Sequence, residues 1–189
     1  MALMVLNFIL SLFFFFTALT AQAAELSFTP ANSSITAAVK YTLIGKYTAG
    51  FEGFKGTITL DDAGTTIRGV TLNIDAASVR SNFPALDKVV RSPGLLDTKK
   101  YPSITFQSTS IEPAAVGYTV KGWLYMHGIV KEVEFPFEAD LSGETVRARG
   151  VWSIARKDFG VTWNKFLDKG GVIVGNTITV KWQIFMNHK

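Results

Sequence analysis

The segment over residues 101–109, YPSITFQST, alternates apolar and polar side chains with a period of two. Ile104 and Phe106 fall on one face, and the polar residues around them fall on the other. Because successive side chains of a strand point to opposite faces of a sheet, this pattern predicts a half-buried strand. Pro102 favours extended geometry for the residue before it, so we expect the strand to follow a turn.

The same alternation recurs along most of the chain and predicts an all-β fold of eight antiparallel strands. The apolar positions of the other segments are Ile35, Ala37, Val39, Tyr41 and Leu43; Phe54, Ile58 and Leu60; Val70, Leu72 and Ile74; Tyr118, Val120, Leu124 and Met126; Val133, Phe135 and Phe137; Val146, Ala148 and Trp152; and Ile178, Val180, Trp182 and Ile184. Turn-forming residues at 115–117, 142–144 and 175–176 separate several of them. Short strands with regular turns are typical of a sandwich or a closed barrel.

Residues 78–96 break the strand pattern. Pro84 suits the first turn of a helix, and Leu86, Val89 and Val90 fall on one helical side. We therefore expect one short helix in a long connecting loop. Loops of this length inside a domain usually serve a function, for example as the mouth of a binding site.

Two groups of charged residues each allow two interpretations. Asp87 and Arg91 are one helical turn apart, which predicts a solvated ion pair; a polar gate at the barrel mouth is the alternative. Arg156 and Asp158 precede a Phe-Gly pair, and each is expected to pair with neighbouring residues. In the alternative, the planar guanidinium of Arg156 binds an anionic head group.

The first 23 residues are predicted to be a signal peptide that is cleaved after Ala23. No charged side chain precedes Glu25, and an apolar run from Phe8 to Leu19 is followed by the small residues of the segment Ala21-Gln22-Ala23. This predicts export to the periplasm and a single domain over residues 24–189. The segment before the run lacks Lys and Arg, so an uncleaved anchor is the alternative. The chain has no cysteine, and an exported form would depend on packing rather than on disulfides.

Charge and motifs argue against nucleic-acid binding and against catalysis. The net charge is +4, and the basic residues occur singly or in pairs, as expected of ordinary solvated side chains. Attraction to an anionic membrane leaflet is the alternative. The chain has two histidines, His127 and His188, and shows none of the spacings of a catalytic triad or a metal site. We expect a structural His127, no metal, no cofactor and no enzymatic activity; a hydrolase or isomerase without a recognisable motif is a minor third hypothesis.

One set of side chains is predicted to point into the barrel and bind a ligand. The alternation assigns to the interior Tyr41, Leu43, Ile104, Phe106, Leu124, Met126, Phe135, Phe137, Trp152 and Trp182. Arg156 and Phe159 are predicted to lie at the mouth of the barrel. Eight-stranded barrels are packed solid in some proteins and hold one small ligand in others. The pattern does not distinguish the two.

Six segments in order along the chain resemble the YceI-like family of periplasmic lipid-binding proteins. They cover residues 51–58, 74–79, 91–97 together with 101–106, 122–131, 154–160 and 175–180. The resemblance implies an extended, antiparallel, lipocalin-like barrel with an elongated cavity for a polyisoprenoid or another long-chain amphiphile. The chain departs from the family pattern at Asn32-Ser33, Lys40-Tyr41 and Arg80-Ser81-Asn82, near the barrel mouth, so the head group is left open.

The functional prediction is a periplasmic carrier for a long-chain isoprenoid or a fatty-acid-like lipid. The alternative is a filled barrel that acts as an interaction module and docks to a membrane redox partner. Peripheral contact with a membrane and a homodimer are further options for partners.

Overall fold

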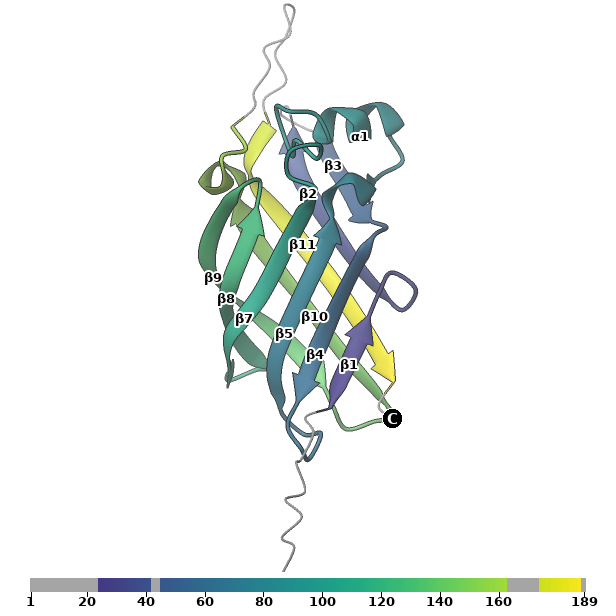
Figure 1. The fold of residues 1–189 in the computed structure, drawn as a ribbon, viewed down its shortest axis with the longest axis vertical. Coiled ribbons are helices and arrows are strands. Elements are labelled where there is room, and N and C mark those ends of the chain that lie inside the picture. The colour runs from purple at the N-terminus through teal and green to yellow at the C-terminus, as the bar shows by residue number, and fades with distance from the viewer. Residues whose placement is uncertain (1–23, 42–44, 163–173, 188–189) are drawn as a thin grey trace, which may run out of the picture.

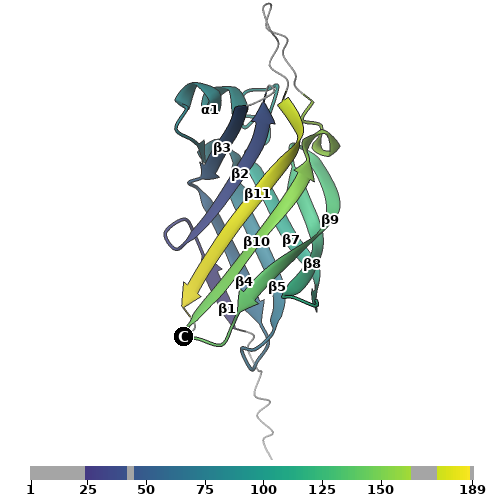
Figure 2. The same ribbon diagram turned by 180° about the vertical axis from the view of Figure 1, so that it is seen from behind.

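The computed structural model describes residues 24–41, 45–162 and 174–187, which form a curled antiparallel sheet with a short helix across one end (Figures 1 and 2). The strands are β1 (Glu25–Phe28), β2 (Ser33–Tyr41), β3 (Gly45–Phe51), β4 (Phe54–Leu60), β5 (Ile67–Asp75), β6 (Val79–Arg80), β7 (Ser103–Pro113), β8 (Tyr118–Met126), β9 (Ile129–Asp140), β10 (Thr145–Ala155) and β11 (Val174–Asn187). The helical elements are α1 (Pro84–Val90) and the single 3₁₀ turns η1 (Ala76–Ser78) and η2 (Arg156–Phe159). The predicted signal peptide and Leu43 lie outside the described residues.

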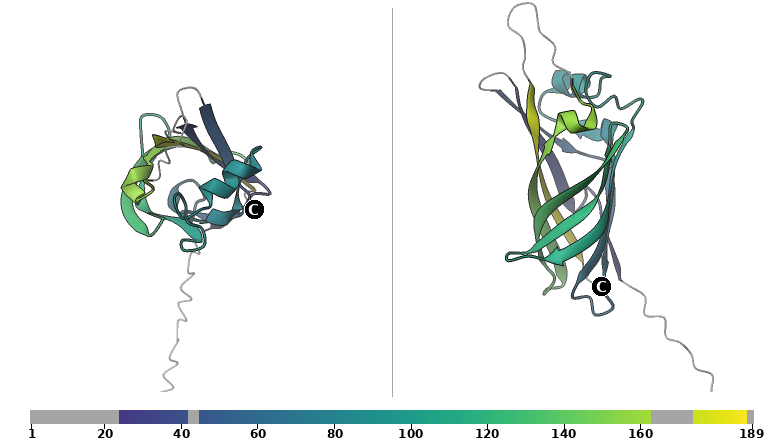
Figure 3. Two further views of the ribbon diagram at one scale, coloured as in Figure 1. Left: turned by 90° about the horizontal axis from the view of Figure 1, so that it is seen from above. Right: turned by 90° about the vertical axis from the view of Figure 1, so that its left-hand side faces the viewer.

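The all-β class and the short helix are confirmed, whereas the strand number is wrong. The described residues form eleven strands in the order β1-β4-β5-β7-β8-β9-β10-β11-β2-β3-β6, and not eight. This order has two ends, β1 and β6, so the sheet of the described residues is open and curled (Figure 3). The three additional strands are β1, with four residues, β6, with two, and β3, whose inward positions include the small residue Ala49.

The period of two correctly separates the inner and outer faces of the strands. In β8, Val120 and Leu124 are buried inside the sheet, while Trp123 between them is 49% exposed on the outside. The same parity buries Ile104 and Phe106 of β7. The inner faces of the strands therefore build one apolar core within the curl.

Among the long strands, β9 and β10 share the shortest ladder. These strands pair only from Arg147↔Asp140 to Arg149↔Glu138. Beyond that short ladder, aromatic side chains supply the contact: the rings of Phe135 and Trp152 stack with centroids 4.7 Å apart and an interplanar angle of 25°. Backbone pairing is thus replaced by ring packing in this part of the wall.

Two of the three predicted turns are confirmed. Residues 115–117 connect β7 to β8, and residues 142–144 connect β9 to β10. The predicted turn at Gly175-Asn176 is wrong, because both residues lie within β11. The pairing of β11 with β2 shifts register between Val174 and Ile178, so the glycine accompanies an irregularity of the strand and not its end.

The long connection between β6 and β7, residues 81–102, covers one end of the sheet, and we call it the lid. It contains α1, which lies across this end of the curl (Figures 1 and 3). Pro84 begins the helix, as the sequence predicts. Below the lid, Tyr47, Ala49 and Val79 form a small second apolar cluster, against which Leu86, Val90 and Leu96 of the lid pack.

Candidate ligand cavity

A cavity of about 230 Å³ lies inside the curled sheet and beneath the lid. Nearly all of its lining side chains are aliphatic or aromatic, and they come from the strands on both sides of the curl and from the lid. An apolar cavity of 150 Å³ in another protein stays dry and binds benzene, so this interior is large enough to hold part of an apolar molecule. The interior of the sheet is therefore hollow at this level and not completely filled.

Nine of the twelve predicted ligand-binding residues line the cavity. They are Ile104, Phe106, Leu124, Met126, Phe135, Phe137, Trp152, Arg156 and Trp182. They lie on β7, β8, β9, β10, η2 and β11, and the curl of the sheet brings them around one space.

The other three predicted residues are not placed there. Tyr41 is half-buried at the lid end of β2 and packs on the second cluster, around Tyr47 and Val79. Phe159, at the end of η2, is buried in the main core and does not line the cavity. Leu43 lies outside the described residues.

The sequence prediction missed lining residues that give a weak signal. Ala37 and Ala49 line the cavity, but a small side chain adds little to an apolar pattern. Val90, Leu95 and Leu96 close the cavity from the lid, where an irregular segment offers no period to follow. Small residues on the wall and large ones on the lid together shape the space.

Aromatic rings form much of the rigid wall. The ring of Phe135 lies between those of Phe106, at 5.4 Å, and Trp152, at 4.7 Å. The ring of Phe137 lies between those of Tyr118, at 5.2 Å, and Trp182, at 5.9 Å. These offset and tilted arrangements are favourable ring contacts, so the wall keeps its shape around the cavity.

Arg156 is buried, with 1% of its surface exposed, and it donates to backbone carbonyls. Its Nε donates to the carbonyl of Gly175 at 2.9 Å, its Nη1 to that of Val161 at 2.6 Å and its Nη2 to that of Val174 at 2.9 Å. Burial lowers the pKa of the guanidinium, but arginine stays protonated in proteins. These bonds tie η2 to the start of β11 and account for the burial of Arg156 without a bound head group.

Asp87 is 2% exposed, so the predicted solvated pair with Arg91 is wrong. Its carboxylate accepts from the hydroxyl of Tyr47 at 2.7 Å, from the hydroxyl of Ser81 at 2.6 Å and from the backbone N–H of Ser81 at 3.0 Å. The hydrogen-bond partners of Asp87 are therefore Tyr47 and Ser81, outside the helix, and not Arg91 one helical turn away. The network anchors α1 to β3 and to the start of the lid.

Opposing effects act on the pKa values in this network. Burial on its own raises the pKa of Asp87, but the hydrogen bonds from Ser81 and Tyr47 outweigh it and hold the pKa below its ordinary value. Burial, followed by the bond to Asp87, raises the pKa of Tyr47 above its ordinary value. Tyr47 thus remains a hydroxyl donor to an ionised Asp87 at neutral pH.

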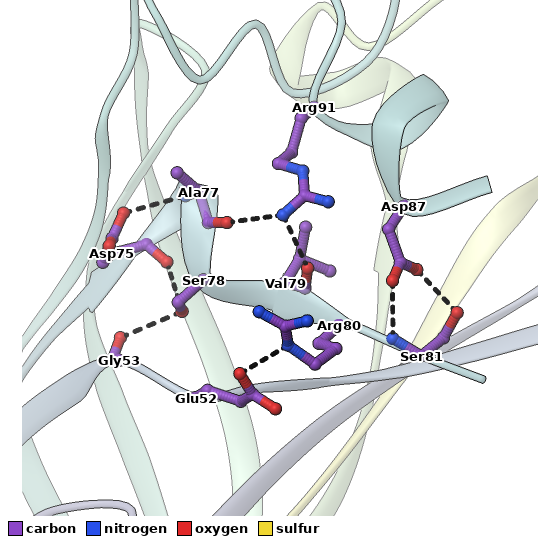
Figure 4. A network of polar contacts seen from close by, with 10 residues as sticks. All are labelled: Glu52, Gly53, Asp75, Ala77, Ser78, Val79, Arg80, Ser81, Asp87 and Arg91. Atoms are coloured by element: carbon purple, nitrogen blue, oxygen red, sulfur yellow. Dashed lines mark hydrogen bonds and ion pairs between the residues drawn. The ribbon is translucent and has the colours of Figure 1, made fainter. Parts of the chain in front are cut away.

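Arg91 fastens the other end of α1 to η1 and β6 (Figure 4). Its Nη1 donates to the carbonyl of Ala77 at 3.1 Å and to that of Val79 at 3.4 Å. Nearby, Arg80 pairs with Glu52 at 2.6 Å on the surface. Asp87 and Arg91 thus hold the lid at two separate points, which neither interpretation of the pair predicted.

His127 lies in the turn between β8 and β9. Its φ of 53° is in the left-handed region, and its Nδ1 donates to the carbonyl of Phe159 at 3.1 Å. Its ring packs on that of Tyr101 at 4.6 Å. These contacts connect the turn to η2 and to the end of the lid.

Within the described residues, no helix is long and apolar enough to span a bilayer.

The described residues thus form an all-β fold, in which a curled antiparallel sheet encloses an apolar cavity beneath a helical lid. The family model described as the YceI-like domain matches residues 26–186. The chain therefore belongs to the YceI-like family.

Individual relatives agree with this assignment. A UPF0312 protein of Yersinia enterocolitica is 33% identical over 120 residues, which cover 59% of this chain and 62% of that protein. Protein YceI of Escherichia coli is 36% identical over 94 residues, covering 50% of this chain and 48% of that protein. The matched segments thus span about half to three fifths of the length of these curated relatives.

Solved structures share the fold. The crystal structure of BcnA from Burkholderia cenocepacia has a TM-score of 0.73 and 26% identity, and the match covers 84% of this chain and 98% of that one. A domain from Saccharophagus degradans, described as polyisoprenoid-binding, has a TM-score of 0.66 and 18% identity, with 89% and 100% of the two chains covered. At that identity the second likeness concerns the fold alone.

Proposed function

We propose that the chain is an exported carrier that holds the apolar tail of a long-chain amphiphilic lipid, of the polyisoprenoid class, in the cavity beneath the lid. The observation that carries the proposal is the cavity of about 230 Å³ with its almost entirely apolar lining. The fold shared with a domain described as polyisoprenoid-binding supports it. Binding without catalysis is part of the proposal.

The size of the cavity limits how much of a ligand it can hold. Pockets for drug-sized molecules measure roughly 300–1,000 Å³, so this one is slightly small for them. About eight buried methylene-sized groups at ~0.8 kcal/mol each would contribute roughly 6 kcal/mol. After at least ~4 kcal/mol of association cost, the ~2 kcal/mol that remains falls short of the ~8 kcal/mol of a micromolar Kd. Micromolar binding therefore requires that further carbons of the tail, or the head group, are bound outside this space.

Native mass spectrometry of protein purified without detergent tests the proposal. A co-purifying lipid mass and saturable binding of a fluorescent isoprenoid analogue are expected. Ala148→Leu fills part of the cavity and should weaken that binding at least tenfold, because Ala148 is 3% exposed and lines the cavity. Ser153→Leu, on the exposed face of the same strand, is the matched control and should bind as the wild type does.

The carrier function would be contradicted by a clean apo mass together with no binding of the analogue by wild type or by Ala148→Leu. That result would favour an interaction module that docks to another protein. Export is tested separately by N-terminal sequencing of protein from the periplasmic fraction. A chain beginning at Ala24 is expected, and an intact Met1 in the membrane fraction would contradict the proposed cleavage.

A further inference from the structure

The alternating direction of the strands sorts the connections to two ends of the sheet. The lid, the 127–128 turn and η2 lie at one end, and the turns over 61–66, 114–117 and 141–144 lie at the other. Figure 1 shows α1 at the upper end and the C-terminal end of the described chain at the lower end. A surface that approaches the molecule end-on therefore meets one of two chemically distinct sets of residues.

The end opposite the lid carries mainly acidic side chains. They are Asp61, Asp62, Glu112, Asp140 and Glu144, compared with Arg68 and Arg147. An anionic surface repels this end. The described chain can thus approach such a surface favourably only through its lid end or its sides.

The lid end carries exposed lysines. Lys88 of α1 and Lys99 and Lys100 at the end of the lid are exposed, whereas the lid's Asp87 is buried and committed to Tyr47 and Ser81. Asp97 is the other acidic residue of the lid. The solvent side of the lid is therefore positive.

Two more lysines extend this positive surface along the neighbouring strands. Lys40 of β2 and Lys46 of β3 are both exposed and lie directly opposite each other in the ladder. Like charges at such positions repel and cost stability unless an anion lies between or near them. Within the part of the chain that the structure describes, neither lysine forms an ion pair, whereas Lys121 and Arg149 on the barrel wall do. Together with Lys88, Lys99 and Lys100, these two lysines outnumber the exposed acidic side chains of this end, which are Glu52, Asp75 and Asp158. Glu52 is moreover paired with Arg80.

Exposed apolar side chains stand among these lysines. Phe83, immediately before α1, is 56% exposed, and Val89 on the outer side of the helix is 36% exposed. On the inner side of the same segment, Val90 and Leu96 line the cavity. A large exposed ring beside basic side chains is the pattern of a segment that lies at a bilayer interface.

We propose that the lid end docks on the surface of an anionic lipid bilayer. Lys40, Lys46, Lys88, Lys99 and Lys100 bind the head groups, and Phe83 and Val89 enter the boundary of the acyl chains. Docking in this orientation brings the lid, and the cavity behind it, to the membrane, so a lipid tail passes between them without crossing water. The docking itself stands on the surface alone; only the passage of the lipid rests on the proposed function.

Co-sedimentation with vesicles tests the docking. Wild-type protein should bind vesicles of phosphatidylcholine mixed with phosphatidylglycerol, should not bind vesicles of phosphatidylcholine alone, and should dissociate as salt is added. Each lysine near an anionic surface contributes roughly fivefold in affinity. Lys88→Glu with Lys99→Glu should therefore weaken binding by at least ~25-fold, since each change also introduces repulsion.

The control is a double variant with the same change in net charge. Arg147→Glu with Lys181→Glu alters exposed basic residues on the outer wall of the sheet and should leave binding within about twofold, since Arg147 lies at the end opposite the lid and Lys181 lies in the middle of β11. An equal loss in both double variants would show attraction by net charge without a preferred face, which contradicts the proposal. No binding of the wild type to anionic vesicles would also overturn the proposal. Binding of the isoprenoid analogue in solution is measured independently, so a failure of docking is distinguished from a failure of the proposed function.

A second readout keeps the test decisive if the lysine variants fold poorly. The chain has no cysteine, so Phe83→Cys can carry a single environment-sensitive fluorophore. Its emission should shift to the blue on anionic vesicles. The same label at Phe185→Cys, on the last strand and 43% exposed, should not shift. Equal shifts at both positions, or none at Phe83, would contradict docking through the lid.

Discussion

Asp87 and Arg156 are the two charged side chains that the described fold buries almost completely. Each is satisfied by the protein itself: Arg156 by backbone carbonyls, and Asp87 by Tyr47 and Ser81. Removing one member of such a group leaves buried polar atoms without partners, which costs more than the bond itself contributed. These residues therefore belong to the framework that holds the lid and η2 in place around the cavity.

Asp87 gives the protein a specific sensitivity to acid. The pKa of its carboxyl is below the ordinary value in the folded state, so ionised Asp87 stabilises the fold above the unfolded-state pKa of about 3.9. This contribution is lost as the pH falls through the lower, folded-state pKa. Asp87→Asn should cost about 1–3 kcal/mol at pH 7, and its deficit relative to wild type should shrink in acid.

Urea unfolding of both forms from pH 7 to pH 3 measures this difference. Asp62→Asn, at an exposed position in the turn between β4 and β5, is the matched control and should change stability by no more than about 0.5 kcal/mol. A deficit of Asp87→Asn that stays constant across the whole range would mean that the charge of Asp87 contributes nothing to the lid.

At the scale of elements, the long alternating segments could be predicted from the sequence. In β8, Val120 and Leu124 are buried whereas Thr119 and Lys121 are only partly buried, so the alternation of apolar and polar residues follows the burial. The exposed Trp123 is the exception. Pro84 similarly indicates the start of α1. Each of these features is local, and local patterns are what a sequence displays most clearly.

The missed features depend on residues that are distant in sequence or small. β3 positions Tyr47 for Asp87, forty residues further along the chain, and no local spacing indicates that bond. Tyr41 has the parity of an inward residue, yet it packs on the second cluster, which β3 and β6 supply. The cavity depends partly on Ala37 and Ala49, whose short side chains leave space. Space left by a small residue is visible only after the wall is assembled.

Gly122 shows how an element makes room for a ring of the cavity wall. It faces inward on β8, where a Cβ atom would overlap the carbonyl oxygen of Gln107 and the ring of Phe106 on the neighbouring strand β7. Gly122→Ala should therefore separate β7 from β8 locally and cost about 1–3 kcal/mol in the free energy of unfolding.

Gly143→Ala is the matched control, because the nearest atoms to its Cβ would be 3.9 Å away. It should stay within about 0.5 kcal/mol of wild type. Thermal or urea unfolding separates the two variants. Equal stability of both would mean that the sheet yields freely around Phe106 and that the wall is less rigid than its ring contacts indicate.

At the scale of the whole molecule, the sheet curls until its first strand approaches its last. β1 pairs with β4 and lies near β11, but within the described residues β1 and β11 do not share a ladder. Side chains therefore close this seam. Phe28 is the buried residue of β1: it is 1% exposed, lines the cavity and places its ring over Gly56 of β4, where a Cβ atom would overlap it.

Phe28→Ala should open the seam and destabilise the protein by about 3–5 kcal/mol, the usual cost of truncating a buried phenylalanine. Phe185→Ala, at a 43% exposed position on β11, removes the same atoms and should cost about 1 kcal/mol or less. Urea unfolding of the two variants provides the measurement. Hydrogen exchange should also show faster exchange in β1 and β4 of Phe28→Ala than in β10 and β11, because opening begins at the strand with one ladder. Equal destabilisation by the two substitutions, with uniform exchange, would mean that the curl is held by its ladders alone and that the seam needs no closing side chain.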